Sequence, residues 1–289
     1  MKKFILLSLF ISIQAKIAES GAEAETETVK EGNFALSTSQ QPGPLLGFGQ
    51  NIIDKGDFQF YFYSDYIKLR NKKTTDPMPG FLYGIRDDLS MFFNIPITKY
   101  IDSADNCKTL AGVSLQCEYA YFSKTNLRSA HQATVLAAIS GPNGSMIKQA
   151  VSNRQSSTFF IGGTYNYMSV DWYIYTSLGE LFSIRQTEES QLGDNFLYQA
   201  GIGRNLYHSK DYIYLFLVEM LGAKFKQNIV SSEIDQNSGG NLIFIAPSFW
   251  FSSKKLIVQI GFAIPVLQNL NGNQGEYKFQ IDGNIGWTF

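Results

Sequence analysis

The residues of this sequence with chemistry to offer are polar side chains that recur at every second position, between apolar ones. The clearest case is the C-terminal stretch 276–289. Its polar positions include Lys278, Gln280, Asp282 and Asn284. Side chains on a strand point alternately to opposite faces, so this pattern predicts a strand with one polar and one apolar face. A soluble β-sandwich and a membrane barrel both contain such strands.

Further candidate residues share a polar, inward position in a predicted strand. They are Gln59, Tyr61, Tyr63, Asp65, Arg86, Asn94, Glu118, Glu219 and Gln259. Charges of both signs are present, which leaves two interpretations open. The side chains form an internal network of salt bridges and hydrogen bonds that fills a narrow lumen, or they line a polar permeation path or binding site. The two tyrosines either contact an aromatic solute or pack the lumen.

The sequence indicates no catalytic constellation. A barrel hydrolase needs a histidine beside a serine on the lipid-facing wall. The chain has two histidines, and His131 begins a predicted strand whereas His208 falls in a predicted turn. Neither is placed for that chemistry, so we expect no enzyme activity and no cofactor.

The two cysteines, Cys107 and Cys117, leave two alternatives open. In an oxidising compartment they form a disulfide if a bend brings their Cα atoms within about 7 Å of each other. Otherwise both are free thiols. The sequence has neither a Cys-x-x-Cys pair nor a histidine cluster, so we expect no metal site.

Composition favours a membrane barrel over other classes. Charged residues make up 17% of the 289 residues, below the roughly 25% of soluble domains. Aromatic residues reach 15%, yet the mean hydropathy is only −0.10, and no internal apolar run approaches the roughly 20 residues of a spanning helix. The net charge of −1 gives no case for nucleic acid.

Three regions follow one another along the chain. Residues 1–24 have a basic start and a short apolar run, which predicts a secretory signal peptide cleaved after Ala15 or, by weak preference, near Ala24. Residues 25–55 are polar and then rich in Gly and Pro, which predicts an extended periplasmic or lumenal lead-in. One hypothesis is that residues 42–49 fold inside as a constriction. Residues 56–289 form the predicted barrel.

Twelve strand-like segments fill this last region. They span about 57–69, 80–86, 89–98, 111–123, 129–140, 157–167, 171–184, 195–207, 211–225, 241–252, 255–267 and 276–289. Most are longer than the 5–6 residues of ordinary strands and suit tilted transmembrane strands. The connections alternate between tight turns and long polar loops, as in outer-membrane barrels. Trp172, Trp250 and Trp287 all fall near the turn side, where amphipathic rings settle.

These patterns predict an all-β fold, a single transmembrane antiparallel barrel of about twelve strands, in the outer membrane of a Gram-negative bacterium. Ile285, Trp287 and the terminal Phe289 resemble the C-terminal signal that the barrel-assembly machinery recognises. The expected partners are therefore outer-membrane lipid, that machinery and a small-molecule solute. The alternative is a soluble periplasmic β protein, which must leave long strand edges exposed.

The sequence also resembles a family over roughly residues 42–289. The stretches "PGPLLGFGQNIIDKGDFQFYFYSDY", "YGIRDDLSMFFNIPI", "IAPSFWF" and "IGFAIPVL" look like the opening and hairpins of outer-membrane β-barrels assigned as transporters to the MetA pathway of phenol degradation. The resemblance implies passive uptake of small, aromatic or hydrophobic solutes. The alternative is a structural or surface-interaction barrel that acts through its long loops, such as 141–157 and 226–240.

Overall fold

The computed structural model describes residues 29–95, 97–100, 108–110, 113–141, 157–184 and 191–289. The predicted signal peptide lies outside the described residues, and so does Cys107. Cleavage and the disulfide therefore stay predictions, and Cys117 lies on the exposed face of its strand. Among the described residues, no helix is both long and apolar enough to cross a bilayer.

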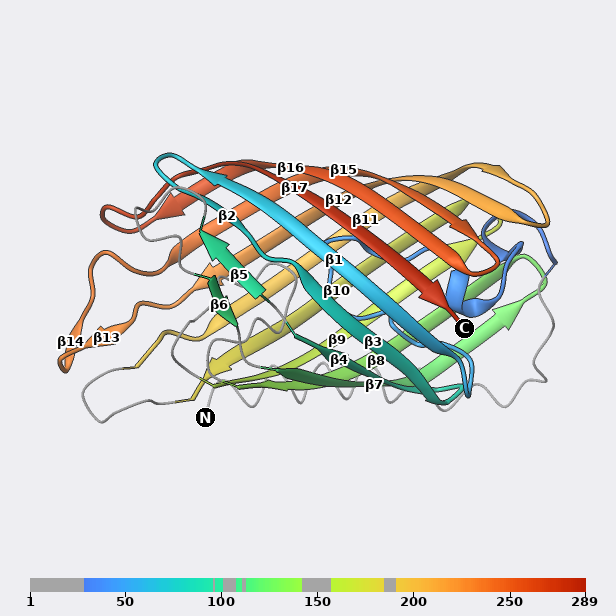
Figure 1. Ribbon diagram of the computed structural model, residues 1–289, viewed down its shortest axis with the longest axis horizontal. Coiled ribbons are helices and arrows are strands. Elements are labelled where there is room, and N and C mark those ends of the chain that lie inside the picture. Colours follow the sequence, from blue (N-terminus) through green and yellow to red (C-terminus); the bar gives the residue numbers. More distant parts are fainter. Residues whose placement is uncertain (1–28, 96, 101–107, 111–112, 142–156, 185–190) are drawn as a thin grey trace.

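Twelve antiparallel strands close into a barrel (Figure 1), as the alternation predicts. They are β1 (Phe58–Leu69), β3 (Met78–Arg86), β4 (Leu89–Asn94), β7 (Ser114–Asn126), β8 (Ser129–Ser140), β9 (Thr158–Ser169), β10 (Trp172–Ser183), β11 (Asn195–His208), β12 (Tyr212–Phe225), β15 (Gly240–Ser253), β16 (Leu256–Leu270) and β17 (Tyr277–Thr288). Strand β1 pairs with β17 and closes the ring. The predicted fold class is confirmed.

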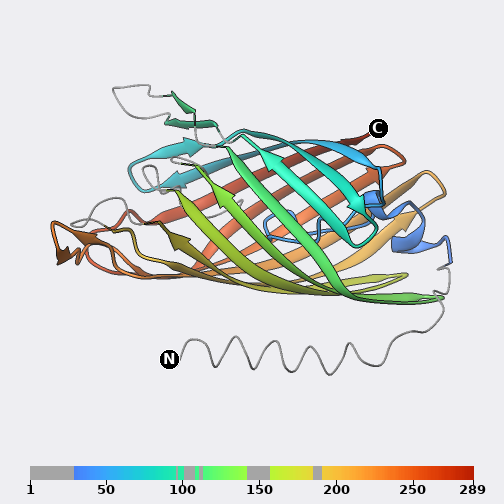
Figure 2. The ribbon, with the colours of Figure 1, turned by 90° about the horizontal axis from the view of Figure 1, so that it is seen from below.

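Short strands extend the wall at one end of the barrel. Strand β2 (Lys73–Thr75) pairs with β1 and with β5 (Ile97–Tyr100), which pairs with β6 (Lys108–Leu110). Figure 2 shows β5 and β6 standing apart from the barrel strands. A separate hairpin joins β13 (Ile229–Val230) to β14 (Glu233–Ile234).

The single strand predicted over 89–98 is wrong beyond residue 94. Strand β4 ends at Asn94, and the chain resumes as β5, which pairs outside the barrel ring. The sequence has a proline at position 96. Proline has no N–H to donate to a strand ladder, so it disfavours a continuous central strand.

The connections divide the barrel into a turn end and a loop end. At the turn end the connections are 87–88, 127–128, 170–171, 209–211 and 254–255, each of two or three residues. At the loop end they are 70–77, 95–113, 141–157, 184–194, 226–239 and 271–276. The predicted alternation of short and long connections is confirmed.

The outer face of the barrel is apolar and the inner face is mixed. In β1, Phe62 is 41% exposed on the outside, whereas Gln59 is fully buried on the inside. In β16, Ile260 is 58% exposed. This exposed band matches the surface that a barrel presents to lipid, and it confirms the alternation assigned to the first strand and to β16.

Two aromatic residues face differently from the sequence prediction. Alternation places Tyr277 on the outer face, but the β1–β17 register shifts between Lys68 and Leu69, so Tyr277 turns inward and its ring meets Phe244 at 5.6 Å. Trp172 and Trp287 are exposed at the turn end as predicted. Trp250, expected there as an interfacial ring, points into the lumen and is buried.

Candidate functional site

The barrel lumen is occupied by residues 29–57, which we call the lumen segment. It includes two short 3-10 turns, η1 (Gly32–Phe34) and η2 (Thr38–Gln40). The backbone N–H of Val29 donates to Leu127 O at 2.8 Å, and that of Gly56 donates to Gly84 O at 2.8 Å. Both contacts lie at the turn end. The segment therefore enters and leaves through the same opening, and Figures 1 and 2 show it in blue inside the wall.

Apolar side chains of the lumen segment build the buried core. Phe34, Leu45, Leu46 and Phe48 are each no more than 5% exposed. Each belongs to a cluster completed by side chains of the wall. The ring of Phe48 meets that of Phe160 edge-on at 4.9 Å. Burial of such side chains contributes roughly 1.5–3 kcal/mol each, so the segment is packed in place.

Glu219 on β12 holds the middle of the lumen segment. Its Oε1 accepts hydrogen bonds from the backbone N–H of Leu46 at 3.2 Å and of Gly47 at 3.4 Å. The Tyr175 hydroxyl donates to the same oxygen at 2.7 Å. Because a segment without regular structure leaves its N–H groups unpaired, a buried carboxylate acceptor stabilises it inside the barrel.

Glu118 on β7 holds Gln50 and Asn51 of the lumen segment in the same way. Its Oε1 accepts from the backbone N–H of Gln50 at 2.6 Å, and its Oε2 from that of Asn51 at 3.1 Å. The hydroxyl of Thr134 donates to Oε1 at 2.6 Å. Gly49 just before has a φ of +78° and no room for a Cβ, which would lie 2.3 Å from a Thr164 methyl. Only glycine fits this backbone position.

Asp65 and Asp282 form a pair across the closing seam of the barrel. They are direct partners in the β1–β17 register, and they are 5% and 0% exposed. The hydroxyl of Tyr63 donates to Asp282, and Gln280 Nε2 donates to it at 2.8 Å. The backbone N–H of Asp76 donates to Asp65 at 3.0 Å. The arrangement holds two acids side by side on the inner face.

A small cavity of about 40 Å³ lies between the lumen segment and one side of the wall. Its lining is Gly47, Phe48, Gly49 and Asn51 of the segment with Tyr61, Tyr63, Met78, Phe92, Asn94, Gln116 and Asn284 of the wall. The wall residues come from β17, β1, β3, β4 and β7, which we call the polar wall. The lining itself is aromatic and amide, with no charged side chain.

The predicted lumen residues divide into three groups. Tyr61 and Tyr63 line the cavity, and Asp65 and Asp282 lie beside it. Glu118 and Glu219 hold the lumen segment, as described above. Gln59 is buried at the turn end, where its Nε2 donates to Thr288 Oγ1 at 2.9 Å.

The prediction that Arg86 and Lys278 face the lumen is wrong. Arg86 lies at the turn end, pairs with exposed Asp88 at 2.9 Å and covers the outer-face ring of Tyr119 at 5.9 Å. Lys278 occupies the register shift at the loop end and pairs with Glu276 at 3.0 Å. Both sit where a strand ends, so alternation no longer fixes the direction of the side chain.

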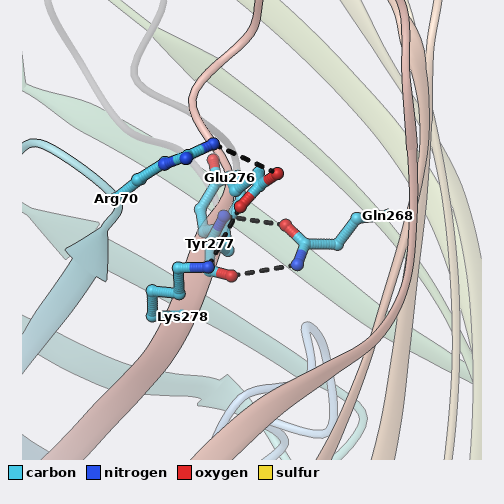
Figure 3. A network of polar contacts seen from close by, with 5 residues as sticks. All are labelled: Arg70, Gln268, Glu276, Tyr277 and Lys278. Carbon is cyan, nitrogen blue, oxygen red and sulfur yellow. Dashed lines mark hydrogen bonds and ion pairs between the residues drawn. The ribbon is translucent and has the colours of Figure 1, made fainter.

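The group around Lys278 is an exposed cluster at the barrel rim (Figure 3). Arg70 and Lys278 both form ion pairs with Glu276. The amide of Gln268 donates to the backbone O of Tyr277 and accepts from its backbone N–H. The pKa of Glu276 lies below its ordinary value because Lys278 donates a hydrogen bond to it and adds, with Arg70, favourable charge. These charges lie outside the lumen.

The expected internal network of both charge signs is also wrong in its composition. Among the described residues, the buried charged side chains are Asp65, Glu118, Glu219 and Asp282. All four are acidic, and no buried lysine or arginine accompanies them in the described part of the chain. The hydrogen-bond network exists, but its donors are backbone N–H, hydroxyl and amide groups.

Sequence reasoning missed several residues of the lumen. Gln199 accepts a hydrogen bond from the backbone N–H of Phe48 at 2.9 Å. Gln50 Oε1 accepts one from Asn166 Nδ2 at 3.0 Å and another from the hydroxyl of Tyr173. The signal that could have found the segment contacts is the inward position of Glu118 and Glu219. Their direct strand partners are Ser90 and Leu136 for Glu118, and Gly201 and Ala246 for Glu219, so each carboxylate needs donors from elsewhere.

The described residues hold no group of three or more His, Cys, Asp or Glu arranged for a metal ion. His131 Nδ1 contacts the Tyr165 hydroxyl at 2.7 Å on the outer face, and His208 ends β11. The absence of a cofactor and of enzyme activity stays an expectation. The C-terminal Ile285, Trp287 and Phe289 face outward, and their role in assembly stays a prediction.

No model of a known protein family matches this sequence, and no curated protein matches it. The fold is similar to that of an outer membrane channel from Pseudomonas putida F1, with a TM-score of 0.63 at 10% identity over 86% of this chain and 99% of that one. LpxR from Salmonella typhimurium has a TM-score of 0.48 at 10% identity, covering 81% and 100% of the two chains. The NanC porin gives 0.46 at 8%, covering 80% and 98%. Identities this low establish a shared barrel fold alone.

Proposed function

We propose that this protein is a passive channel of the Gram-negative outer membrane for small solutes. In this orientation the turn end faces the periplasm and the loop end faces outward, because outer-membrane barrels have short periplasmic turns and long external loops. Ile285, Trp287 and Phe289 present the C-terminal assembly signal to the barrel-assembly machinery. The apolar outer band contacts lipid.

The observation that carries this proposal is the cavity beside the lumen segment. The segment packs mainly against β8–β12, β15 and β16, its Leu45 and Leu46 also cluster with Tyr63 and Met78, and a cavity remains along the polar wall. The interior of a twelve-stranded barrel is wider than that of a filled eight-stranded barrel and narrower than that of an open sixteen-stranded porin. The volume that the lumen segment occupies therefore decides how much of the lumen stays open. The lumen segment is thus the constriction of the channel.

The solute class follows from the lining and from the family resemblance. Tyr61, Tyr63 and Phe92 offer aromatic faces, and the amides of Asn94 and Gln116 offer hydrogen bonds. Rings of this kind accept flat apolar groups. The resemblance to transporters of the phenol-degradation pathway also supports aromatic or hydrophobic solutes.

The alternative is a structural or surface-interaction barrel that acts through its loops. The buried core around Phe34, Leu45, Leu46 and Phe48 favours it, because a well-packed segment blocks part of the lumen. The two proposals differ in whether the folded barrel conducts.

Planar-bilayer recording of the refolded protein tests the proposal, followed by liposome swelling with small aromatic and sugar solutes. We expect small steady channels in the full chain. Deleting residues 25–50 should raise single-channel conductance several-fold, since conductance follows the open cross-section of the lumen.

A control deletion removes residues 231–232, the exposed turn between β13 and β14. That deletion should leave conductance unchanged. If the full chain is folded but silent and the 25–50 deletion is silent too, the channel proposal is wrong and the loops become the site of function. An unchanged conductance after the 25–50 deletion contradicts the constriction.

A further inference from the structure

The charges of the barrel are distributed unevenly between its inside and its outside. The whole chain is nearly neutral, with 24 Lys and Arg against 25 Asp and Glu. The buried charged residues of the described part are nevertheless all acidic, namely Asp65, Glu118, Glu219 and Asp282. The side chains of Lys226, Lys254 and Lys278 pair with acids at the ends of the barrel, where they are 45% exposed or more. The acidic groups are therefore concentrated inside the barrel, and the basic groups that pair with acids lie at its ends.

The Asp65–Asp282 pair is a poor choice for stability alone. Two carboxylates directly opposite each other on paired strands are destabilising when both are ionised. Hydrogen bonds lower that cost: Tyr63 and Gln280 donate to Asp282, and the backbone N–H of Asp76 donates to Asp65. The position of the pair relative to the cavity therefore decides what else the two acids can do.

The pair lies on the loop-end side of the cavity, on the inner faces of β1 and β17. Tyr63 lines the cavity, and Asp65 is two residues nearer the loop end on the same face of β1. Asn284 lines the cavity too, and Asp282 is two residues nearer the loop end on β17. Below the cavity, Asn51 donates to Glu118, so acids lie on both sides of it.

Two buried amides of the cavity add an independent observation. Asn284 is 3% exposed and its Oδ1 has no hydrogen-bond partner among the described residues, while its Nδ2 donates to Gln259 at 2.7 Å. Gln116 is 7% exposed, and its Nε2 likewise has no partner there. Asn284 lines the cavity two residues from Asp282 on the inner face of β17, and an amide oxygen without a protein donor has the chemistry of a cation ligand, since hard cations take oxygen ligands.

We propose that the lumen passes small cations in preference to anions, and that Asp65 and Asp282 determine this selectivity with Asn284 as a neutral oxygen ligand. Rings of Asp and Glu give cation channels their selectivity in the same way. The inference rests on the proposed channel function and adds the charge class of its permeant.

The reversal potential of the full-length protein in planar bilayers under a KCl gradient tests this inference. We expect potassium to be more permeant than chloride. Each of the substitutions Asp65→Asn and Asp282→Asn should lower the permeability ratio about threefold, the effect of one charge at several ångströms in a water-like dielectric. Asp65→Glu keeps the charge and should keep the preference.

Asp211→Asn is the matched control. It removes one negative charge from an exposed turn-end residue that pairs with Lys254, and it should leave the ratio unchanged. A mobility shift on unheated gels shows which variants are folded barrels, and Asp65→Asn alone suffices if Asp282→Asn does not fold.

The outcomes separate the two proposals. A conducting protein that shows no preference for potassium, or that loses the preference equally in Asp211→Asn, overturns the selectivity inference and leaves the channel. A folded but silent protein overturns the channel function, and the selectivity inference falls with it.

Discussion

The lumen segment lies between two sides of one barrel that differ in chemistry. Against β8–β12, β15 and β16, which we call the packed wall, it meets large apolar side chains such as Phe160 and Leu217, both fully or almost fully buried. Against the polar wall it meets Tyr63 and Met78 and the carboxylate of Glu118, and there it leaves a cavity. The difference teaches that one irregular segment both completes a core and borders a cavity, because each side of the wall supplies a different inner face.

The largest loss of stability is expected from the packed wall. Phe160→Ala removes a fully buried ring that contacts Phe48 and fills the space above Gly162 and Gly179. It should lower the free energy of unfolding by about 3–5 kcal/mol. Phe92→Ala on the polar wall removes a ring that borders the cavity, so its cost should be clearly smaller. Urea unfolding in lipid measures both, and equal losses would show that the two walls do not differ in packing.

The outer faces of the two walls are expected to be alike. Ile260 on β16 and Ile281 on β17 are 58% and 40% exposed near the middle of their strands. Replacing either by arginine should cost about 2–4 kcal/mol at the bilayer midplane. Ile260→Leu is the control and should be nearly neutral. A negligible cost for either arginine, measured by folding into lipid vesicles, would contradict the assigned outer face.

A smaller effect is expected where the packed wall holds the segment by hydrogen bonds. Glu219→Ala leaves the N–H groups of Leu46 and Gly47 without their acceptor. An unsatisfied buried donor costs about 1–3 kcal/mol. Glu180→Ala removes a carboxylate that pairs with Lys226 at the loop end and serves as control. The same unfolding assay compares them, and a Glu219 variant no weaker than the Glu180 variant argues against the segment being held there.

The smallest effect is expected at the rim of the polar wall. The pKa of Glu276 is lowered in the folded protein, chiefly by Lys278. A lowered acid pKa stabilises the fold above the unfolded pKa, and this contribution is lost as the pH falls through the folded pKa. Because both side chains are exposed, Lys278→Gln should change neither conductance nor the unfolding midpoint measurably at neutral pH. A changed potassium-to-chloride ratio in this variant would extend the selective region beyond Asp282.

The wall of the barrel could be predicted from the sequence more fully than its contents. Alternation marks the strands because lipid and lumen demand opposite side chains at neighbouring positions, as at Phe62 and Gln59. The same rule fails at Tyr277 and Arg86, where a register shift or a strand end removes the constraint. Residues 29–57 have no period, and their position depends on distant partners such as Glu219. Composition therefore predicts an irregular lead-in but not its buried contacts with the wall.

Both ends of the lumen segment lie at the same opening of the barrel, and this has a topological consequence. Residues at both of its ends, Val29 and Gly56, bond to the same rim of the barrel. The chain between them is a loop that never threads through the ring closed by β1 and β17. Such a loop can be inserted or withdrawn as one piece while every strand pairing stays intact. The order in which the barrel closes and the segment enters is therefore not dictated by connectivity, and either sequence of events reaches the same final structure.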